Sequence, residues 1–386
     1  MNAPRPPTAD LRWRAQARVD LDVVRENVRS LRAAAGSAQV MAVVKADGYG
    51  HGMVPVARAA VSAGASWLGV AVLEEAMRLR AAGLDCRVFC WLAAPGEDFA
   101  PAIAADVDLS ASATWAVAEI AVAARSVGRP ARLHLKVDSG LGRGGATPAE
   151  WANLVEAAGK EQASGTIEVV GVWSHLACAD EPGRPENAAQ IGAFRAAVEF
   201  AERAGLRPQV RHLANSAGTV ALPDAHFDLV RPGIAVYGCS PAPEVGDSAS
   251  FGLRPAMTLV ARLAHVKRVP AGHGVSYGHT YVTDRQTTLG LVPVGYADGI
   301  PRAAGNTAPL WAAGARRRIA GRVCMDQFVV DLGDDAADIG EEVVLFGTGE
   351  SGEPTVQEWA DAIGTITYEI VTRIGERIPR VYRGTA

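Results

Sequence analysis

Eight short apolar runs, rich in β-branched residues, recur through the first 230 residues of this chain, and helix-length segments separate them. Strands that are apolar on both faces and alternate with helices are typical of a parallel sheet covered on both sides. Eight such units predict a (β/α)8 barrel of the TIM type, for which about 250 residues is usual. The runs lie at residues 40–45, 67–71, 87–92, 107–110, 132–137, 168–173, 210–213 and 227–230.

An open, doubly wound α/β sheet is the alternative fold for the same alternation. Its dinucleotide-binding versions carry a Gly-x-Gly-x-x-Gly turn after the first strand. The first apolar run is followed instead by KADGYGHG at residues 45–52, which lacks that spacing. The barrel is therefore the predicted fold.

The pattern changes beyond residue 250, where alternating apolar and polar segments are broken by Gly, Pro and Asp. The proline- and serine-bearing stretch at 240–250 marks the boundary. One late helix is expected at about 355–363. We expect a flexible tail over residues 1–13, the barrel over 14–250 and a mostly β domain over 251–386. We also consider a first strand from the N-terminus as part of the barrel.

Composition excludes several classes of function. The formal net charge is -4 and basic residues form no long run, so nucleic acid is not an expected partner. No apolar stretch is long enough to span a membrane, and the N-terminus carries prolines and Asp10 where a signal peptide needs an apolar core. The five cysteines are scattered, which predicts reduced thiols and no metal site. We expect a soluble, cytoplasmic protein.

The polar residues that directly follow predicted strands are the candidates for chemistry, because catalytic groups of a TIM barrel gather at that rim. Each has an ordinary structural interpretation when taken alone, such as an ion-paired lysine or a salt-bridged arginine. Lys45 is the most informative, since its ammonium must reach the barrel mouth and a glycine-rich turn with Tyr49 follows it. The candidates are Lys45, Lys136, Arg143, His175, Asn215, Ser216 and Arg231.

The run AVVKADGYGHG around Lys45 resembles the motif by which the alanine racemase family attaches pyridoxal phosphate. The resemblance extends from about residue 14 to 383. Asp47 is a departure, because many members carry asparagine and alanine in this part of the motif, but it removes no functional role. Eight further motifs follow in the order of the family: LGRGG, WSHLA, ANSAG, VRPGIAVYG, GVSYGHTY, VGYADG, VCMDQ and TITYEI.

This resemblance implies two bases on opposite faces of the substrate. Lys45 would hold the cofactor covalently and act on the D-enantiomer, and Tyr277 would act on the L-enantiomer. Racemisation requires a proton to leave one face of the α-carbon and return to the other, which one base does not easily achieve. His175 would join Tyr277 to Arg231, and Arg231 would hydrogen-bond the pyridine nitrogen of the cofactor.

The remaining roles implied by the resemblance concern the phosphate and the substrate. Arg143 would contact the cofactor phenolate and the substrate carboxylate, and Lys136 matches a lysine that is carbamylated in relatives. Met325 would present its backbone to the substrate carboxylate, while Tyr296 and Asp180 match positions along the access channel. The cofactor-binding set is completed by Tyr49, Asn215, Ser216, Gly233, Ile234 and Tyr368.

In the family, the β domain reaches the barrel mouth of a second subunit, so the resemblance implies a homodimer with shared sites and an inactive monomer. The implied activity is interconversion of L-alanine and D-alanine, which supplies D-alanine for peptidoglycan.

Three alternatives remain. Relatives with similar motifs act on serine, lysine or several amino acids. Decarboxylases of similar fold use a Glu-Pro-Gly-Arg segment, which occurs here at 181–184 but follows the His175 motif and is interpreted as a turn. A non-catalytic carrier of pyridoxal phosphate would lack the β domain.

Overall fold

The computed structural model describes residues 13–384, which form two compact units. The barrel unit is Leu21–Arg254, and the β unit combines the residues up to Asp20 with those from Pro255 onward. Apart from Trp13, the flexible tail predicted for residues 1–13 lies outside the described residues.

The barrel unit is built on eight parallel strands that hydrogen-bond in the order β8-β7-β6-β5-β4-β3-β2-β9. The backbone NH of Asp228, just before β9, donates to the carbonyl oxygen of Arg211 in β8 at 3.0 Å and closes the ring. Every predicted run overlaps one strand, so the predicted (β/α)8 barrel is confirmed. The strands are β2 (Gln39–Val43), β3 (Trp67–Val70), β4 (Arg87–Cys90), β5 (Val107–Ala111), β6 (Ala131–Lys136), β7 (Ile167–Trp173), β8 (Val210–His212) and β9 (Leu229–Val230).

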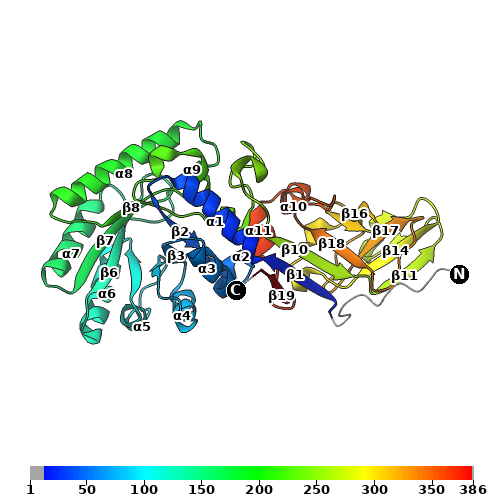
Figure 1. Cartoon of the computed structure of the whole chain (residues 1–386), viewed down its shortest axis with the longest axis horizontal. Coiled ribbons are helices and arrows are strands. Elements are labelled where there is room, and N and C mark those ends of the chain that lie inside the picture. The colour runs from blue at the N-terminus through cyan, green and yellow to red at the C-terminus, as the bar shows by residue number, and fades with distance from the viewer. Residues whose placement is uncertain (1–12, 385–386) are drawn as a thin grey trace. The chain divides into compact units, whose positions relative to one another are not determined.

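Helices lie outside the strands of the barrel unit (Figure 1). In α1, Val24, Val28 and Leu31 recur every three or four residues and are buried, because this spacing places them on one face. The helices of this unit are α1 (Leu21–Ala35), α2 (Lys45–Tyr49), α3 (Met53–Ser62), α4 (Leu73–Ala81), α5 (Ala100–Ala104), α6 (Thr114–Val127), α7 (Trp151–Ala163), α8 (Pro185–Arg203) and α9 (Ser216–Ala221).

The barrel interior combines an apolar core with a few buried polar groups. Asp108, His134 and His212 are inaccessible to solvent although they come from the strands themselves. Buried polar groups are tolerated only when they are hydrogen-bonded, so these three side chains require partners. The apolar part of the core contains Met41, Trp67, Phe89, Trp173, Val210 and Leu229.

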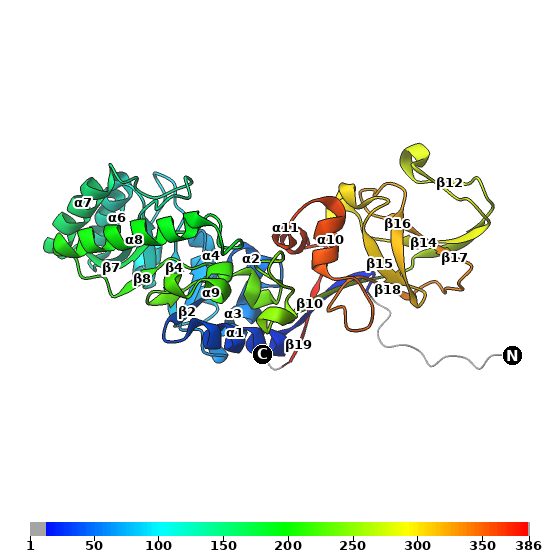
Figure 2. The same cartoon turned by 90° about the horizontal axis from the view of Figure 1, so that it is seen from above.

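The β unit contains a nine-stranded sheet in the order β11-β14-β17-β16-β15-β18-β10-β1-β19, and a separate pair, β12 with β13. Figure 2 shows β12 apart from the strands of the large sheet. Its strands are β1 (Ala15–Asp20), β10 (Met257–Arg262), β11 (His265–Val269), β12 (Gly274–Val275), β13 (Tyr281–Val282), β14 (Thr287–Val292), β15 (Pro309–Ala312), β16 (Ala315–Ala320), β17 (Phe328–Gly333), β18 (Glu342–Phe346) and β19 (Arg380–Arg383).

The N-terminal strand β1 belongs to this sheet, because it pairs antiparallel with β10 and parallel with β19. The expectation that it joins the barrel is therefore wrong. The physical reason lies in its burial pattern: Ala17 and Val19 are buried, whereas Arg18 and Asp20 between and after them are only half-buried. Such alternation suits a sheet with one solvated face, whereas barrel strands are covered on both faces.

The predicted late helix is α10 (Val356–Ile363), and it begins as expected after Thr355. The Thr355 side chain accepts a hydrogen bond from Glu358 N, and the Glu358 side chain accepts one from Thr355 N, which forms a capping box. Trp359 anchors the helix to the sheet by donating to the carbonyl oxygen of Leu345 in β18 at 2.6 Å. A second helix, α11 (Thr367–Thr372), was not predicted.

Within residues 13–384, no helix combines the length and apolar character needed to cross a bilayer. The same residues contain no group of three or more His, Cys, Asp or Glu side chains placed to hold a metal ion. All five cysteines are unpaired thiols in the described part of the chain.

Candidate active site

Lys45 follows β2 and opens a left-handed turn at the rim of the barrel. Residues 46–50 all have positive φ, from 49° to 77°. Only glycine adopts this region freely, so Ala46, Asp47 and Tyr49 are held there against their own preference. Glu75 supplies part of the restraint, because its Oε1 accepts a hydrogen bond from Ala46 N at 2.6 Å.

The amine of Lys45 lies in a partly buried, electropositive setting. Its Nζ is 5.7 Å from the ring centroid of Trp91. Burial, and after it the charge of Arg143, lowers the pKa of Lys45, while the charge of Glu75 acts in the opposite direction. A lowered pKa increases the neutral fraction of the amine, which is the nucleophilic form.

Arg231 follows β9 and is buried, with only 5% of its surface exposed. Its Nη2 donates to the carbonyl oxygen of Ser174 at 2.7 Å and to that of Leu213 at 3.1 Å, and both guanidinium ends contact imidazoles. Within residues 13–384 it forms no ion pair with a carboxylate. Burial lowers the pKa of Arg231 to about 9, so it remains protonated at neutral pH.

His175 lies just beyond β7, next to this guanidinium. Its Nδ1 is 3.1 Å from Arg231 Nη2 and must accept the hydrogen bond, because arginine only donates. Burial first, and then the charges of Arg231 and Arg143, hold the pKa of His175 well below its usual value. His175 is therefore neutral and carries its proton on Nε2, which makes that nitrogen a donor.

Lys136 ends β6, and its Nζ is 4.5 Å from the ring centroid of Trp173. Burial and the charges of Arg143 and Arg231 lower the pKa of Lys136 to about 8. Arg143 itself is exposed. Its charge acts on Lys45, Lys136 and His175 alike, so the structure brings these four predicted residues together.

A polar cradle lies beside this cluster, where Tyr49 meets the turn after β9. A Cβ on Gly233 would stand only 2.3 Å from Tyr49 Oη, so the close approach of this hydroxyl to the backbone requires glycine. Ser216 Oγ accepts hydrogen bonds from Gly233 N at 2.7 Å and from Ala235 N at 3.4 Å. Hydroxyl groups and backbone NH groups gathered in this way are suited to a phosphate.

Two other predicted residues adjoin the cradle. Ile234 begins the 3₁₀ helix η2 (Ile234–Tyr237) directly after Gly233. Asn215 caps α9, and its side-chain oxygen accepts a hydrogen bond from Gly218 N at 2.9 Å. The geometry thus gives Asn215 a supporting role, because it fixes the start of the helix that carries Ser216.

The β unit holds the other predicted residues on exposed loops. Tyr277 is 71% exposed, Met325 54% and Tyr296 45%. Backbone hydrogen bonds tie the Tyr296 loop to the Met325 loop, with Ala297 N donating to Met325 O at 2.9 Å. Ser276, next to Tyr277, donates to Arg322 O at 2.7 Å. This bond joins the loop of Tyr277 to the loop of Met325. Tyr368 is half-buried in α11 of the same unit.

The Glu-Pro-Gly-Arg segment at 181–184 forms a turn, in which Arg184 N donates to Glu181 O at 3.0 Å. The Arg184 side chain pairs with Glu186 at 2.8 Å, and both are about half exposed. Asp180, just before the turn, is also exposed. The interpretation of this segment as an ordinary turn is confirmed.

Several residues at the site were missed from the sequence. Trp91 directly follows β4, but it lies within the predicted run at 87–92 and is aromatic, so the rule that selected Lys45 passed over it. Glu75 lies in the first turn of a helix, where acidic residues are common, so nothing distinguished it. His134 and His212 lie inside strands, and a search for residues after strands passes over them.

Comparison with known proteins follows the same two-part division. The protein-family model "Alanine racemase, N-terminal domain" matches residues 19–241, and the family model "Alanine racemase, C-terminal domain" matches residues 256–382. An alanine racemase of Frankia casuarinae is 64% identical over 369 residues, which cover 96% of each chain. One of Streptomyces coelicolor is 60% identical over 379 residues, with 97% of each chain covered.

Solved structures agree with these similarities. The alanine racemase of Streptomyces lavendulae, which produces D-cycloserine, superposes with a TM-score of 0.96 at 59% identity, covering 99% of both chains. The alanine racemase of Bacillus anthracis with bound L-Ala-P superposes with a TM-score of 0.88 at 34% identity, covering 97% of this chain and 96% of the other.

Proposed function

The chain belongs to the alanine racemase family, and on that premise we propose that it interconverts L-alanine and D-alanine with pyridoxal phosphate as its cofactor. The observation that carries the proposal is the cluster at the barrel mouth. A lysine of lowered pKa, a neutral histidine and a buried arginine lie together there, beside a cradle suited to phosphate.

The residues present fit this cofactor. Lys45 would hold its aldehyde carbon, Arg231 would donate to its ring nitrogen, and the hydroxyls of Tyr49 and Ser216 with the backbone of Gly233 would bind its phosphate. The tight contact that a Cβ on Gly233 would disrupt supports this assignment. The bound cofactor withdraws electron density from the α-carbon of the attached amino acid and so makes the α-proton acidic.

Two side chains would move the proton. Lys45 would take it from, or return it to, the face exposed in D-alanine, and Tyr277 would do the same on the opposite face. His175 supports the second base, because its Nε2–H is free of the Arg231 contact and can donate to a phenolate oxygen. Arg231 would hold His175 in the required tautomer.

The substrate carboxylate would be bound by Arg143 and by the backbone at Met325, with Tyr296 lining the access channel. Tyr368 would complete the phosphate ligands. Lys136 would orient Arg143 once carbamylation has turned its cation into an anion. The pKa of Lys136, about 8, supports this step, because the neutral amine is the form that reacts with carbon dioxide.

The enzyme would act as a homodimer with shared sites. Tyr277, Tyr296 and Met325 are large side chains exposed on three linked loops, which suits contact with a second copy. The unpaired cysteines fit a reducing compartment. We therefore also propose that the enzyme works in the cytoplasm, where it supplies D-alanine for peptidoglycan.

The decisive experiment incubates the reconstituted protein with L-alanine, L-serine and L-lysine separately in heavy water. Deuterium at the α-carbon and loss of optical activity are expected together, fastest with alanine. Faster turnover of serine or lysine would change the assigned substrate. Release of carbon dioxide would indicate a decarboxylase, and absence of deuteration would indicate a carrier.

Variants then test the two bases separately. Tyr277→Phe should abolish deuteration of L-alanine and leave Lys45-dependent deuteration of D-alanine. Tyr281→Phe is the matched control, because Tyr281 lies nearby in sequence but donates to Asp331 at 2.7 Å within the β unit. Equal loss with both enantiomers in Tyr277→Phe would contradict the assignment of faces.

A further inference from the structure

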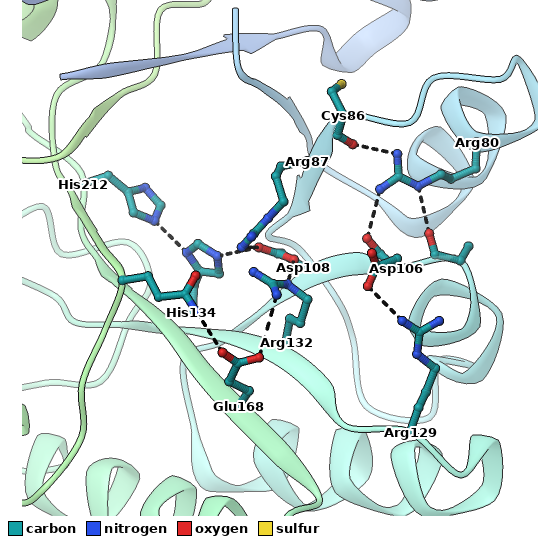
Figure 3. A network of polar contacts seen from close by, with 12 residues as sticks. Arg80, Cys86, Arg87, Asp106, Asp108, Arg129, Arg132, His134, Glu168 and His212 are labelled. Carbon is teal, nitrogen blue, oxygen red and sulfur yellow. Dashed lines mark hydrogen bonds and ion pairs between the residues drawn. The ribbon is translucent and has the colours of Figure 1, made fainter. Parts of the chain in front are cut away.

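A chain of buried polar side chains runs through the barrel interior from Arg231 to β5. Arg231 Nη1 is 3.1 Å from His212 Nδ1, and His212 Nε2 is 2.9 Å from His134 Nδ1. His134 Nε2 is in turn 3.1 Å from Asp108 Oδ2. Figure 3 shows the last two of these contacts. The proposed reaction uses only the first member of this chain.

The direction of every hydrogen bond in the chain is fixed by its two ends. Arg231 only donates, so His212 Nδ1 must accept and the proton of His212 lies on Nε2. That proton is donated to His134 Nδ1, which leaves the His134 proton on Nε2, facing Asp108. Burial keeps the pKa of both imidazoles below the usual value, which agrees with neutral rings.

The Asp108 end is anchored by other charged residues. Arg87 from β4 contacts Asp108 Oδ2 at 2.8 Å, and Arg132 from β6 contacts Oδ1 at 2.7 Å. Glu168 from β7 lies 3.7 Å from Arg132. The two arginines contact both oxygens of the Asp108 carboxylate and so fix its orientation, with Oδ2 as the acceptor that faces His134.

Aromatic side chains of the barrel core pack around the two imidazole rings. Phe89 lies 4.4 Å from the His134 ring, centroid to centroid, and the Trp173 ring stacks parallel to His212 at 5.8 Å. Gly171 in β7 has no side chain, and a Cβ there would stand 2.1 Å from His134 Nδ1. Glycine at this position therefore makes the space in which His134 meets His212.

We propose that His212, His134 and Asp108 form a one-directional hydrogen-bond chain that positions Arg231, with Asp108 as its anchor. If the link to His134 were broken, His212 could carry a proton on Nδ1 and would then repel the guanidinium. The hydrogen-bond chain excludes the tautomer of His212 that carries its proton on Nδ1. The consequence for turnover rests on the proposed function of Arg231, whereas the arrangement of protons does not.

The arrangement of protons can be measured directly by nitrogen NMR on the full-length protein labelled with ¹⁵N-histidine, with the His212→Asn and His134→Leu variants used for assignment. Both rings are expected to be neutral with the proton on Nε2. His134→Leu should shift the His212 proton to Nδ1 or make the ring titrate. A wild-type His212 or His134 with its proton on Nδ1 would overturn the proposal, whatever the enzyme catalyses.

Turnover tests the positioning role through a double-mutant cycle. An asparagine at 212 offers an amide oxygen where Nδ1 now accepts from Arg231, and its orientation no longer depends on a proton. His134→Leu should therefore lower kcat by about 10- to 100-fold in the wild-type background and by less than about threefold in His212→Asn. Equal losses in both backgrounds would mean that His134 has only a packing role.

A second variant breaks the chain without removing any of its members. Gly171→Ala should reproduce the His134→Leu effect on the His212 ring and on kcat, because the new methyl group displaces His134. Gly159→Ala in α7 is the matched control, since a Cβ there meets nothing within 4 Å. A normal His212 ring in a folded Gly171→Ala protein whose kcat has fallen would also contradict the proposal.

Discussion

Arg231 keeps its charge inside the barrel with hydrogen bonds to imidazole nitrogens and carbonyl oxygens. A planar guanidinium can serve these partners together because its donors diverge at fixed angles. A carboxylate beside it would compete with the cofactor nitrogen for the same protons. The neutral surroundings thus leave the charge available to the reaction.

Arg231→Lys should therefore be severely impaired although the charge is kept. An ammonium cannot reach both imidazoles and the carbonyl of Ser174, so we expect kcat to fall by roughly 100-fold. Steady-state kinetics in both directions measures the loss. Arg184→Lys, in the exposed turn, is the control and should stay near the wild-type rate. Similar rates for both variants would argue that the several hydrogen bonds of the Arg231 guanidinium are not required for turnover.

Lys136 should carry a carbamate that depends on pH. Its pKa of about 8 means that the reactive neutral amine increases as the pH rises through that value, so at equal concentrations of dissolved labelled carbon dioxide the carbamate should form faster at about pH 9 than at about pH 7. Carbon NMR should detect one carbamate signal that is absent in Lys136→Ala. Lys160→Ala, whose side chain is 73% exposed, should keep the signal. A signal that survives in Lys136→Ala would refute the assignment.

At the level of secondary structure, the left-handed turn after Lys45 is a strained element of the site, because Ala46, Asp47 and Tyr49 have positive φ. A Cβ on Gly48 would lie 3.2 Å from the backbone N and Cα of Met53, in addition to the cost of its φ of 63°. The turn therefore depends on glycine both for its conformation and for its contact with α3.

Gly48→Ala separates these two contributions when it is compared with Gly83→Ala. Gly83 also has positive φ, but a Cβ there meets nothing within 4 Å. We expect Gly83→Ala to lower the free energy of unfolding by about 1 kcal/mol and Gly48→Ala by roughly 1–2 kcal/mol more. Urea denaturation measures both. Equal losses would mean that the contact with Met53 relaxes without cost.

The barrel strands were predictable because burial on both faces leaves an uninterrupted apolar run that needs no tertiary information. β1 was misassigned because a six-residue strand does not specify its partners, and those lie more than 230 residues away. The positions of Lys45, His175 and Arg231 at strand ends followed from the fold. The role of His134 could not be predicted in this way, because a histidine within a strand indicates a function only when the side chains around it are known.

At the level of the whole molecule, shared active sites make a distinctive prediction about mixtures of inactive variants. Lys45→Ala and Tyr277→Phe should each be inactive in racemisation as homodimers. After dissociation and reassociation together, half of the dimers contain one chain of each kind, and each of these has one intact site. Activity should thus return to about one quarter of the wild-type value. No recovery, despite subunit exchange demonstrated by mass spectrometry, would indicate that each site is built from a single chain.

The pairing of β1 with β10 and β19 has a consequence for how the nascent chain acquires its structure. β1 is translated before the barrel unit, and the whole barrel unit must follow before its partners β10 and β19 appear. While β1 is still unpaired, the charges of Arg18 and Asp20 discourage its association with neighbouring chains. The sheet is completed only when β19 has emerged, so a chain truncated before β19 would expose β1 as an unpaired edge.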